Sequence, residues 1–151
     1  MYPPRHEDGR YTAIELGSDY YFYCSGISMA RELVKQNIPT SIFVFNHSPT
    51  VDVPNSFPAC SGNFSCHSAE LSFVWGTYRY YDARRTDREK EISTEIMNEI
   101  ANFAHDKPTK IPRFSLDKQN VWGFGLESKI LEDYRGKQCK MWDRIGGYFN
   151  H

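Results

Sequence analysis

His67 is the residue whose type and neighbours point most directly to chemistry. It follows Cys66 and precedes residues 68–71, which have the pattern of a short amphipathic turn of helix. An imidazole can accept a proton from a nucleophile and return it to a leaving group, as a general base does. The alternative is a structural histidine, which is the more common case for a histidine considered alone.

Cys60 and Cys66 allow three interpretations of the approach to His67. A disulfide between them would stiffen the backbone just before the histidine, although so small a ring stabilises less than a long one. Two free thiols are the second interpretation. A zinc site that includes His67 is the third, but the spacing matches no common set of zinc ligands. We favour the local disulfide and expect no metal.

The segments before His67 are expected to be a strand of a sheet followed by a loop that leads to His67. Residues 40–45 are apolar and rich in β-branched and aromatic side chains, which predicts a central strand covered on both faces, as in an α/β sheet. His47 is then interpreted as a strand-end histidine without a catalytic role. Residues 49–65 contain three prolines and form a predicted surface loop of a length that is often functional.

Helical patterns flank this region on both sides. Residues 1–10 are expected to be irregular, and a helix is predicted from Ser18 to just before Pro39. Thr86 and Glu89 form a capping box that predicts a helix to His105, and the stripe that it would bury is Ile92, Ile96, Ile100, Phe103 and Ala104. A last helix is predicted over residues 136–149, and strand-like pieces lie at residues 113–116, 121–124 and 128–131.

The charge pattern gives no reason to expect a nucleic acid or an anionic membrane as partner, because the net charge is -1 and cations alternate with acids. The charged run 84–91 is predicted to be a solvated helix start. The acids Glu15, Asp19 and Asp52 belong to no motif, and we expect them to face solvent. No segment has the roughly 18 apolar residues that a membrane span requires.

The context of the chain is expected to be secretory. Four cysteines and two N-x-[ST] sequons, at Asn46 and Asn63, suggest an oxidising compartment and glycosylation. However, the first residues are polar and contain no apolar core of a signal peptide. We therefore expect the sequence to be a piece of a longer, secreted protein.

Five ordered segments resemble the type-B carboxylesterase and cholinesterase family. The stretch 66–76 is similar to that family's histidine segment, C-H-G-x-E-L followed by F-V-F-G, with Ser68 in place of the glycine. Further similarity lies in the aromatic helix start that ends in Cys24, in the strand 42–47, in the helix 91–104 and in the segment 139–143. Agreement in order and spacing makes the resemblance much stronger than a match at one histidine.

The resemblance implies the C-terminal part of an α/β-hydrolase fold over residues 1–151, incomplete as an independent domain. It implies that His67 is the general base of a serine esterase and that Glu70 braces the structure behind the ring. It also implies a Cys24–Cys139 disulfide, which leaves Cys60 to pair with Cys66. The expected substrate is a carboxylic ester, and no cofactor is expected.

The catalytic serine is missing from the sequence. No G-x-S-x-G motif occurs, and its nearest match, residues 26–30, lies within a predicted helix. The glycine-rich oxyanion segment is absent too. We therefore expect no activity from this chain alone, and marginal stability because apolar faces lack their partners. The alternative is a fragment of a non-catalytic, cholinesterase-like binding or adhesion protein.

Overall fold

The chain folds into two compact units, each assembled from separated stretches of sequence. The computed structural model describes residues 2–3, 9–50, 65, 67–77 and 85–146. Unit 1 comprises Met1–Ile42, Arg113–Val121 and Leu131–His151, and unit 2 comprises Phe43–Pro112 and Trp122–Ile130. His67 therefore belongs to unit 2, and the disulfide implied by the resemblance falls within unit 1.

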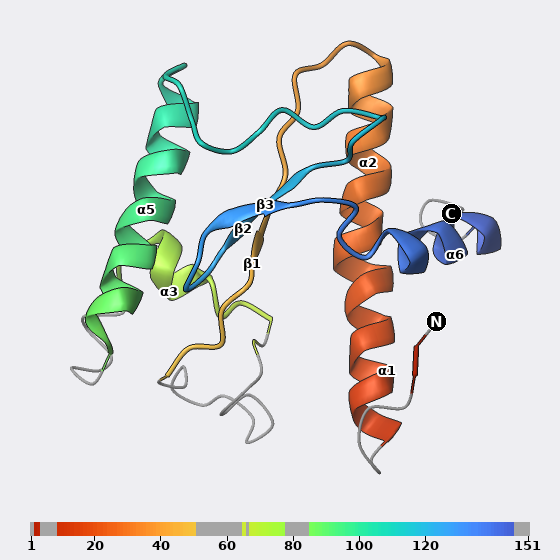
Figure 1. Cartoon of the computed structure of the whole chain (residues 1–151), viewed down its shortest axis with the longest axis horizontal. Helices are drawn as coiled ribbons and strands as arrows, with labels where there is room; N and C mark the ends of the chain where they lie inside the picture. The colour runs from red at the N-terminus through yellow and green to blue at the C-terminus, as the bar shows by residue number, and fades with distance from the viewer. Residues whose placement is uncertain (1, 4–8, 51–64, 66, 78–84, 147–151) are drawn as a thin grey trace. The chain divides into compact units, whose positions relative to one another are not determined.

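Unit 1 is dominated by one long run of helix. Helix α1 (Gly9–Ser18), a π-helical turn (Asp19–Tyr23) and helix α2 (Cys24–Lys35) follow one another without a break (Figure 1). The predicted helix start at Ser18 is wrong, as is the irregular structure expected at Gly9 and Arg10. Helix α1 buries none of its residues, so no buried apolar stripe marks it as a helix.

The spacing of Tyr23, Ile27, Ala30 and Val34 predicts one helical face, of which Ile27 and Ala30 are buried and Tyr23 and Val34 are half-buried. Cys24 is also buried, and the helix ends at Lys35. Asn37 then takes a left-handed conformation, with φ 60°, just before Ile38 and Pro39. Asparagine tolerates this conformation better than most residues do, which allows the chain to leave the helix sharply.

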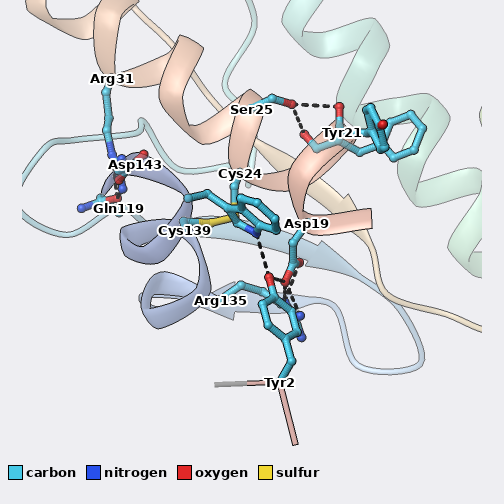
Figure 2. Close-up of a disulfide and its surroundings, with 12 residues drawn as sticks. Tyr2, Asp19, Tyr21, Cys24, Ser25, Arg31, Gln119, Arg135, Cys139 and Asp143 are labelled. Atoms are coloured by element: carbon cyan, nitrogen blue, oxygen red, sulfur yellow. Dashed lines mark hydrogen bonds and ion pairs between the residues drawn. A yellow bond between two sulfur atoms is a disulfide. The ribbon is translucent and has the colours of Figure 1, made fainter. Parts of the chain in front are cut away.

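The disulfide Cys24–Cys139 joins α2 to helix α6 (Gly136–Ile145). Both cysteines are buried, and the pairing is the one that the family resemblance implies (Figure 2). Helix α6 is shorter than predicted, because Gly146 adopts a left-handed conformation that ends it. Phe149, which was expected to extend the helix, lies outside the described residues.

A buried ion pair lies near this disulfide. The Asp19 carboxylate, only 3% exposed, accepts hydrogen bonds from the guanidinium of Arg135, with Nε 2.7 Å from Oδ1. Tyr2 donates to Asp19 at 2.8 Å (Figure 2). Trp142 Nε1 donates to the Tyr2 hydroxyl at 2.9 Å. Glu15 pairs with the same guanidinium. The solvent-facing role expected for Asp19 is wrong, because a buried carboxylate is stable when a guanidinium and further donors surround it.

Within the described residues, three strands form one sheet. Strand β2 (Val121–Phe124) lies between β1 (Phe43–Phe45) and β3 (Lys129–Leu131), and β1 runs parallel to β2 with Phe45 opposite Phe124. Residues 125–128 are too few for a parallel crossover, so β3 is antiparallel to β2 and the sheet is mixed.

The central position predicted for residues 40–45 is wrong within the described part of the chain. Strand β1 lies at an edge of the three strands, and the Phe43 side chain is 41% exposed. The apolar run indicates that these residues form a strand. Its position within the sheet depends on which distant segments pair with it. The predicted strand at residues 113–116 is reduced to one bridge, between Ser41 and Arg113.

The core of unit 2 is built on helix α5 (Asp87–Ala104). Helix α3 (Leu71–Val74) packs beside it (Figure 1). The buried core comprises Phe73, Ile92, Ile96, Ile111 and Phe124. The capping box of Thr86 and Glu89 is present as predicted. The predicted stripe ends early, because Phe103 and Ala104 are exposed.

Large apolar side chains are exposed in both units, as expected. They include Ile14, Tyr21, Phe22, Met29, Phe43, Leu71, Trp75, Leu126 and Ile145. None of the helices in the described residues combines the length and apolar character needed to cross a bilayer.

Removal of the Cys24–Cys139 bond is expected to destabilise the chain strongly, since the two residues are 115 positions apart. The chain-entropy model assigns about 4 to 5 kcal/mol to a loop of this size. The double variant Cys24→Ser/Cys139→Ser should lose a comparable free energy of unfolding, measured by urea denaturation with circular dichroism. A loss below about 1 kcal/mol would contradict the prediction.

Candidate active site

His67 is exposed and opens the turn 67–70 that leads into α3. The turn is closed by backbone hydrogen bonds: the Leu71 amide donates to the Ser68 carbonyl at 3.2 Å, and the Phe73 amide donates to the Glu70 carbonyl at 2.9 Å. His67 thus lies at the surface of the described residues, on a turn that backbone hydrogen bonds hold in place.

Ser68 holds the backbone next to His67 in a left-handed conformation, with φ 69°. Glycine adopts this conformation without a steric penalty, whereas a residue with a Cβ atom does so at some cost. Ser68 stands where the resembling family has glycine. The backbone at Ser68 therefore has a conformation that suits glycine.

Phe73 anchors the segment after His67 to the core. Its carbonyl accepts a hydrogen bond of 2.7 Å from the hydroxyl of Ser93 on α5. Its fully buried ring lies 4.8 Å from the ring of Phe45 and 5.9 Å from the ring of His47, measured between centroids. The turn that carries His67 is thus attached to both the sheet and α5.

Glu89 forms a second titratable cluster with His47. The Glu89 side chain is fully buried, and its Oε1 lies 3.1 Å from His47 Nε2. The carboxylate also accepts bonds from the amide and hydroxyl of Thr50, at 2.7 and 2.6 Å, and from the amide of Thr86 at 3.0 Å. His47 does lie just after a strand, as predicted, and it is buried here, whereas His67 is exposed.

Hydrogen bonds keep Glu89 charged. Burial alone would raise the pKa of its carboxyl, but the bonds from Thr50, Thr86 and His47 outweigh burial and lower the pKa to about 2. The position at the start of α5 adds the positive end of the helix dipole. The prediction that the run 84–91 is solvated is wrong for Glu89 and for Arg85, which are both buried.

The remaining predicted site residues fall into two groups. Glu70 is half-buried directly before α3, and its bracing role stays a prediction. Asn46 is exposed at the end of β1, as a glycosylation acceptor must be. The predictions for Cys60, Cys66, Asn63, Asp52 and the loop between the cysteines lie outside the described residues.

The aromatic residues after His67 separate into different environments. Phe73 belongs to the buried core. Trp75 is 72% exposed, and Tyr78 lies outside the part of the chain that is described. The nearest match to a nucleophile elbow, residues 26–30, lies inside α2, as predicted.

Sequence reasoning missed Arg85 and Ser72, which contact the segment after His67. The Arg85 guanidinium donates to the Ser72 hydroxyl at 2.9 Å and lies 4.4 Å from the centre of the Phe73 ring. It also missed the buried Glu89–His47 pair. The capping box identified Glu89 as a helix-start residue, but nothing local indicates that Thr50 and His47 would fold onto it.

Comparison with known proteins gives consistent relatives. The sequence model of the carboxylesterase family matches residues 3–142. The cAMP-regulated D2 protein of Dictyostelium discoideum is 32% identical over 128 residues, which are 81% of this chain and 22% of that protein. Acetylcholinesterase 1 of Caenorhabditis briggsae is 25% identical over 142 residues, 82% of this chain and 22% of the relative. The chain spans about a fifth of the length of these relatives.

Solved structures show the same fold. A PNB esterase superposes with a TM-score of 0.67 at 20% identity, over 91% of this chain and 28% of the esterase. A thermophilic PNB esterase superposes with a TM-score of 0.69 at 20% identity, over 92% of this chain and 28% of that esterase. The predicted fold class is confirmed: the mixed sheet with its flanking helices is part of an α/β-hydrolase fold.

Replacement of Ser68 by glycine is expected to raise the free energy of unfolding by up to about 1 kcal/mol, because glycine takes positive φ freely. Ser68→Val should lower it, since a β-branched residue is disfavoured there. The matched control is Ser18→Gly, where φ is -62° and glycine should destabilise the helix instead. Equal stability of the Ser68→Gly and Ser68→Val proteins in urea denaturation would refute the assigned backbone conformation.

Glu89 is expected to make stability depend on acid pH. Its pKa is about 2 in the folded chain against an ordinary 4.5, so its contribution is complete above pH 4.5 and is lost as the pH falls toward 2. Glu89→Gln should flatten this part of the pH profile and lower stability at neutral pH, because buried donors lose their carboxylate.

The control for Glu89 is Glu91→Gln, whose side chain is 65% exposed on the same helix. Urea denaturation at a series of pH values measures the three profiles. A Glu89→Gln profile that parallels that of the unmodified chain between pH 4.5 and 2 would count against a buried, charged Glu89.

Proposed function

This chain belongs to the carboxylesterase family, and from that premise we propose that it is the C-terminal segment of a serine carboxylic ester hydrolase and supplies His67 as the catalytic base. The observation that carries the proposal is the exposed imidazole on the ordered turn 67–70, inside the region that the family matches. Family membership supports carboxylic esters as the substrate class.

The proposed chemistry needs four groups, of which this chain provides one. His67 would accept the proton of a serine hydroxyl and later return it to the leaving alcohol. The serine, the carboxylate that orients the imidazole and the donors of the oxyanion hole would come from sequence outside residues 1–151. The absence of a G-x-S-x-G motif from the sequence supports this division, and the chain alone is then inactive.

The proposed setting is the secretory pathway. The buried Cys24–Cys139 disulfide fits an oxidising compartment. A glycan on Asn46 fits the exposure of that side chain, and a second one is proposed at Asn63. A Cys60–Cys66 disulfide belongs to the same proposal.

A chimera tests the proposal. The chain would replace the aligned part of the PNB esterase, and hydrolysis of p-nitrophenyl esters would be measured. We expect turnover by the chimera, none by the isolated chain, and a loss of at least about 1,000-fold in kcat for His67→Ala, because removal of a triad base has effects of this order or larger.

The control variant is His105→Ala, which changes an exposed histidine just after α5 and should leave turnover unchanged. Chimera turnover that survives His67→Ala would refute the role of His67. Turnover by the isolated chain that is lost in His67→Ala would refute the proposed inactivity. A folded but inactive chimera would favour the non-catalytic binding protein.

A further inference from the structure

Arg85 is a buried cation next to the segment that carries His67. Its side chain is 5% exposed, although it lies in a charged run directly before the capping residue of α5. A guanidinium is costly to remove from water unless polar or aromatic groups compensate it. Its partners in the fold therefore indicate what it stabilises.

The first partner of Arg85 leads toward His67 by hydrogen bonds. Arg85 Nη2 donates to Ser72 Oγ at 2.9 Å, and Ser72 Oγ donates to the Ala69 carbonyl at 3.4 Å. A serine hydroxyl can accept and donate at once, and a charged donor strengthens the bond that the hydroxyl gives. Ser72 and Ala69 are both buried. This path ends two residues after His67, at the residue that follows left-handed Ser68.

The second partner of Arg85 is the Phe73 ring, 4.4 Å from the guanidinium carbon. A cation over an aromatic face at this distance is attractive, more so when both are shielded from water. Arg85 therefore contacts two consecutive residues of α3, a helix of four residues. A helix this short is not stable by its own hydrogen bonds, so outside contacts must fix it.

We propose that Arg85 is a positioning residue for His67. Through Ser72 and Phe73 it fixes the start of α3, and through the Ala69 carbonyl it holds the left-handed turn that sets where the imidazole lies. The consequence for ester hydrolysis rests on the proposed function, because a general base must be held in register with its nucleophile. The structural part of the inference does not depend on that function.

Nuclear magnetic resonance of the full chain tests the inference without a substrate. Arg85→Met keeps an unbranched side chain but removes the charge and the donors. Ser72→Ala removes only the hydroxyl that links Arg85 to the Ala69 carbonyl. Both should shift the ring signals of His67 and the amide signals of residues 68–71. Hydrogen exchange of the Leu71 amide, which donates to the Ser68 carbonyl, should accelerate about tenfold in both variants. A tenfold change in this rate corresponds to about 1.4 kcal/mol.

Two further variants separate positioning from packing. Arg85→Lys keeps a charged donor, so its His67 signals should lie much closer to those of the unmodified chain than the Arg85→Met signals do. If Arg85 only filled space, Lys and Met would shift the signals equally. Arg88→Met is the matched control: it removes an arginine on α5 that donates to the Leu126 carbonyl, and it should leave the His67 signals in place.

The inference fails if Ser72→Ala, a small change that preserves the core, leaves the His67 and Leu71 signals unchanged, even if Arg85→Met unfolds the chain. It fails equally if Arg85→Met folds and moves these signals no more than Arg88→Met does. Shifted signals together with an inactive chimera would keep the positioning role and reject the esterase proposal, so the two failures are distinguishable.

Discussion

A carboxylate that is removed completely from water must be surrounded by donors, and Glu89 imposes this condition on the unit that contains His67. Its oxygens accept from the amide and hydroxyl of Thr50, from the Thr86 amide and from the His47 ring. Loss of such partners leaves a buried charge uncompensated, which costs several kcal/mol. The end of β1 and the start of α5 are therefore fixed relative to each other.

The His67 turn depends on that framework through Phe73. The Phe73 ring contacts His47 and Phe45, and its carbonyl is bonded to Ser93 of α5. The two histidines thus have different roles. His47 is buried and compensates a carboxylate, whereas His67 extends from an ordered turn into solvent. Of these two histidines, His67 is the one that the fold leaves exposed.

Features with local causes could be predicted from the sequence. The Thr86–Glu89 capping box joins residues three apart, and the buried positions of Ile27 and Ala30 follow from spacing within one helix, α2. The Cys24–Cys139 pair came from the family resemblance, because spacing alone cannot select one of the three pairings of four cysteines. The candidate base followed from the same resemblance.

Features that depend on distant partners were missed. Asp19 and Arg135 are 116 residues apart, so no local pattern marks Asp19 as buried. Arg85 lies in a run that looks solvated until the chain brings Ser72 and Phe73 onto it. Helix α1 is not predicted from the sequence because it buries none of its residues. Strand β1 is wrongly predicted to be central because its apolar run does not indicate which strands pair with it.

Footprinting of the histidines with diethylpyrocarbonate, read by peptide mass spectrometry, tests the central claim most directly. The claim is that His67 is exposed to solvent and that His47 is enclosed with Glu89. Rapid modification of His67, with His47 protected until the fold is denatured, is the predicted result. Protection of His67 together with rapid modification of His47 would contradict the account.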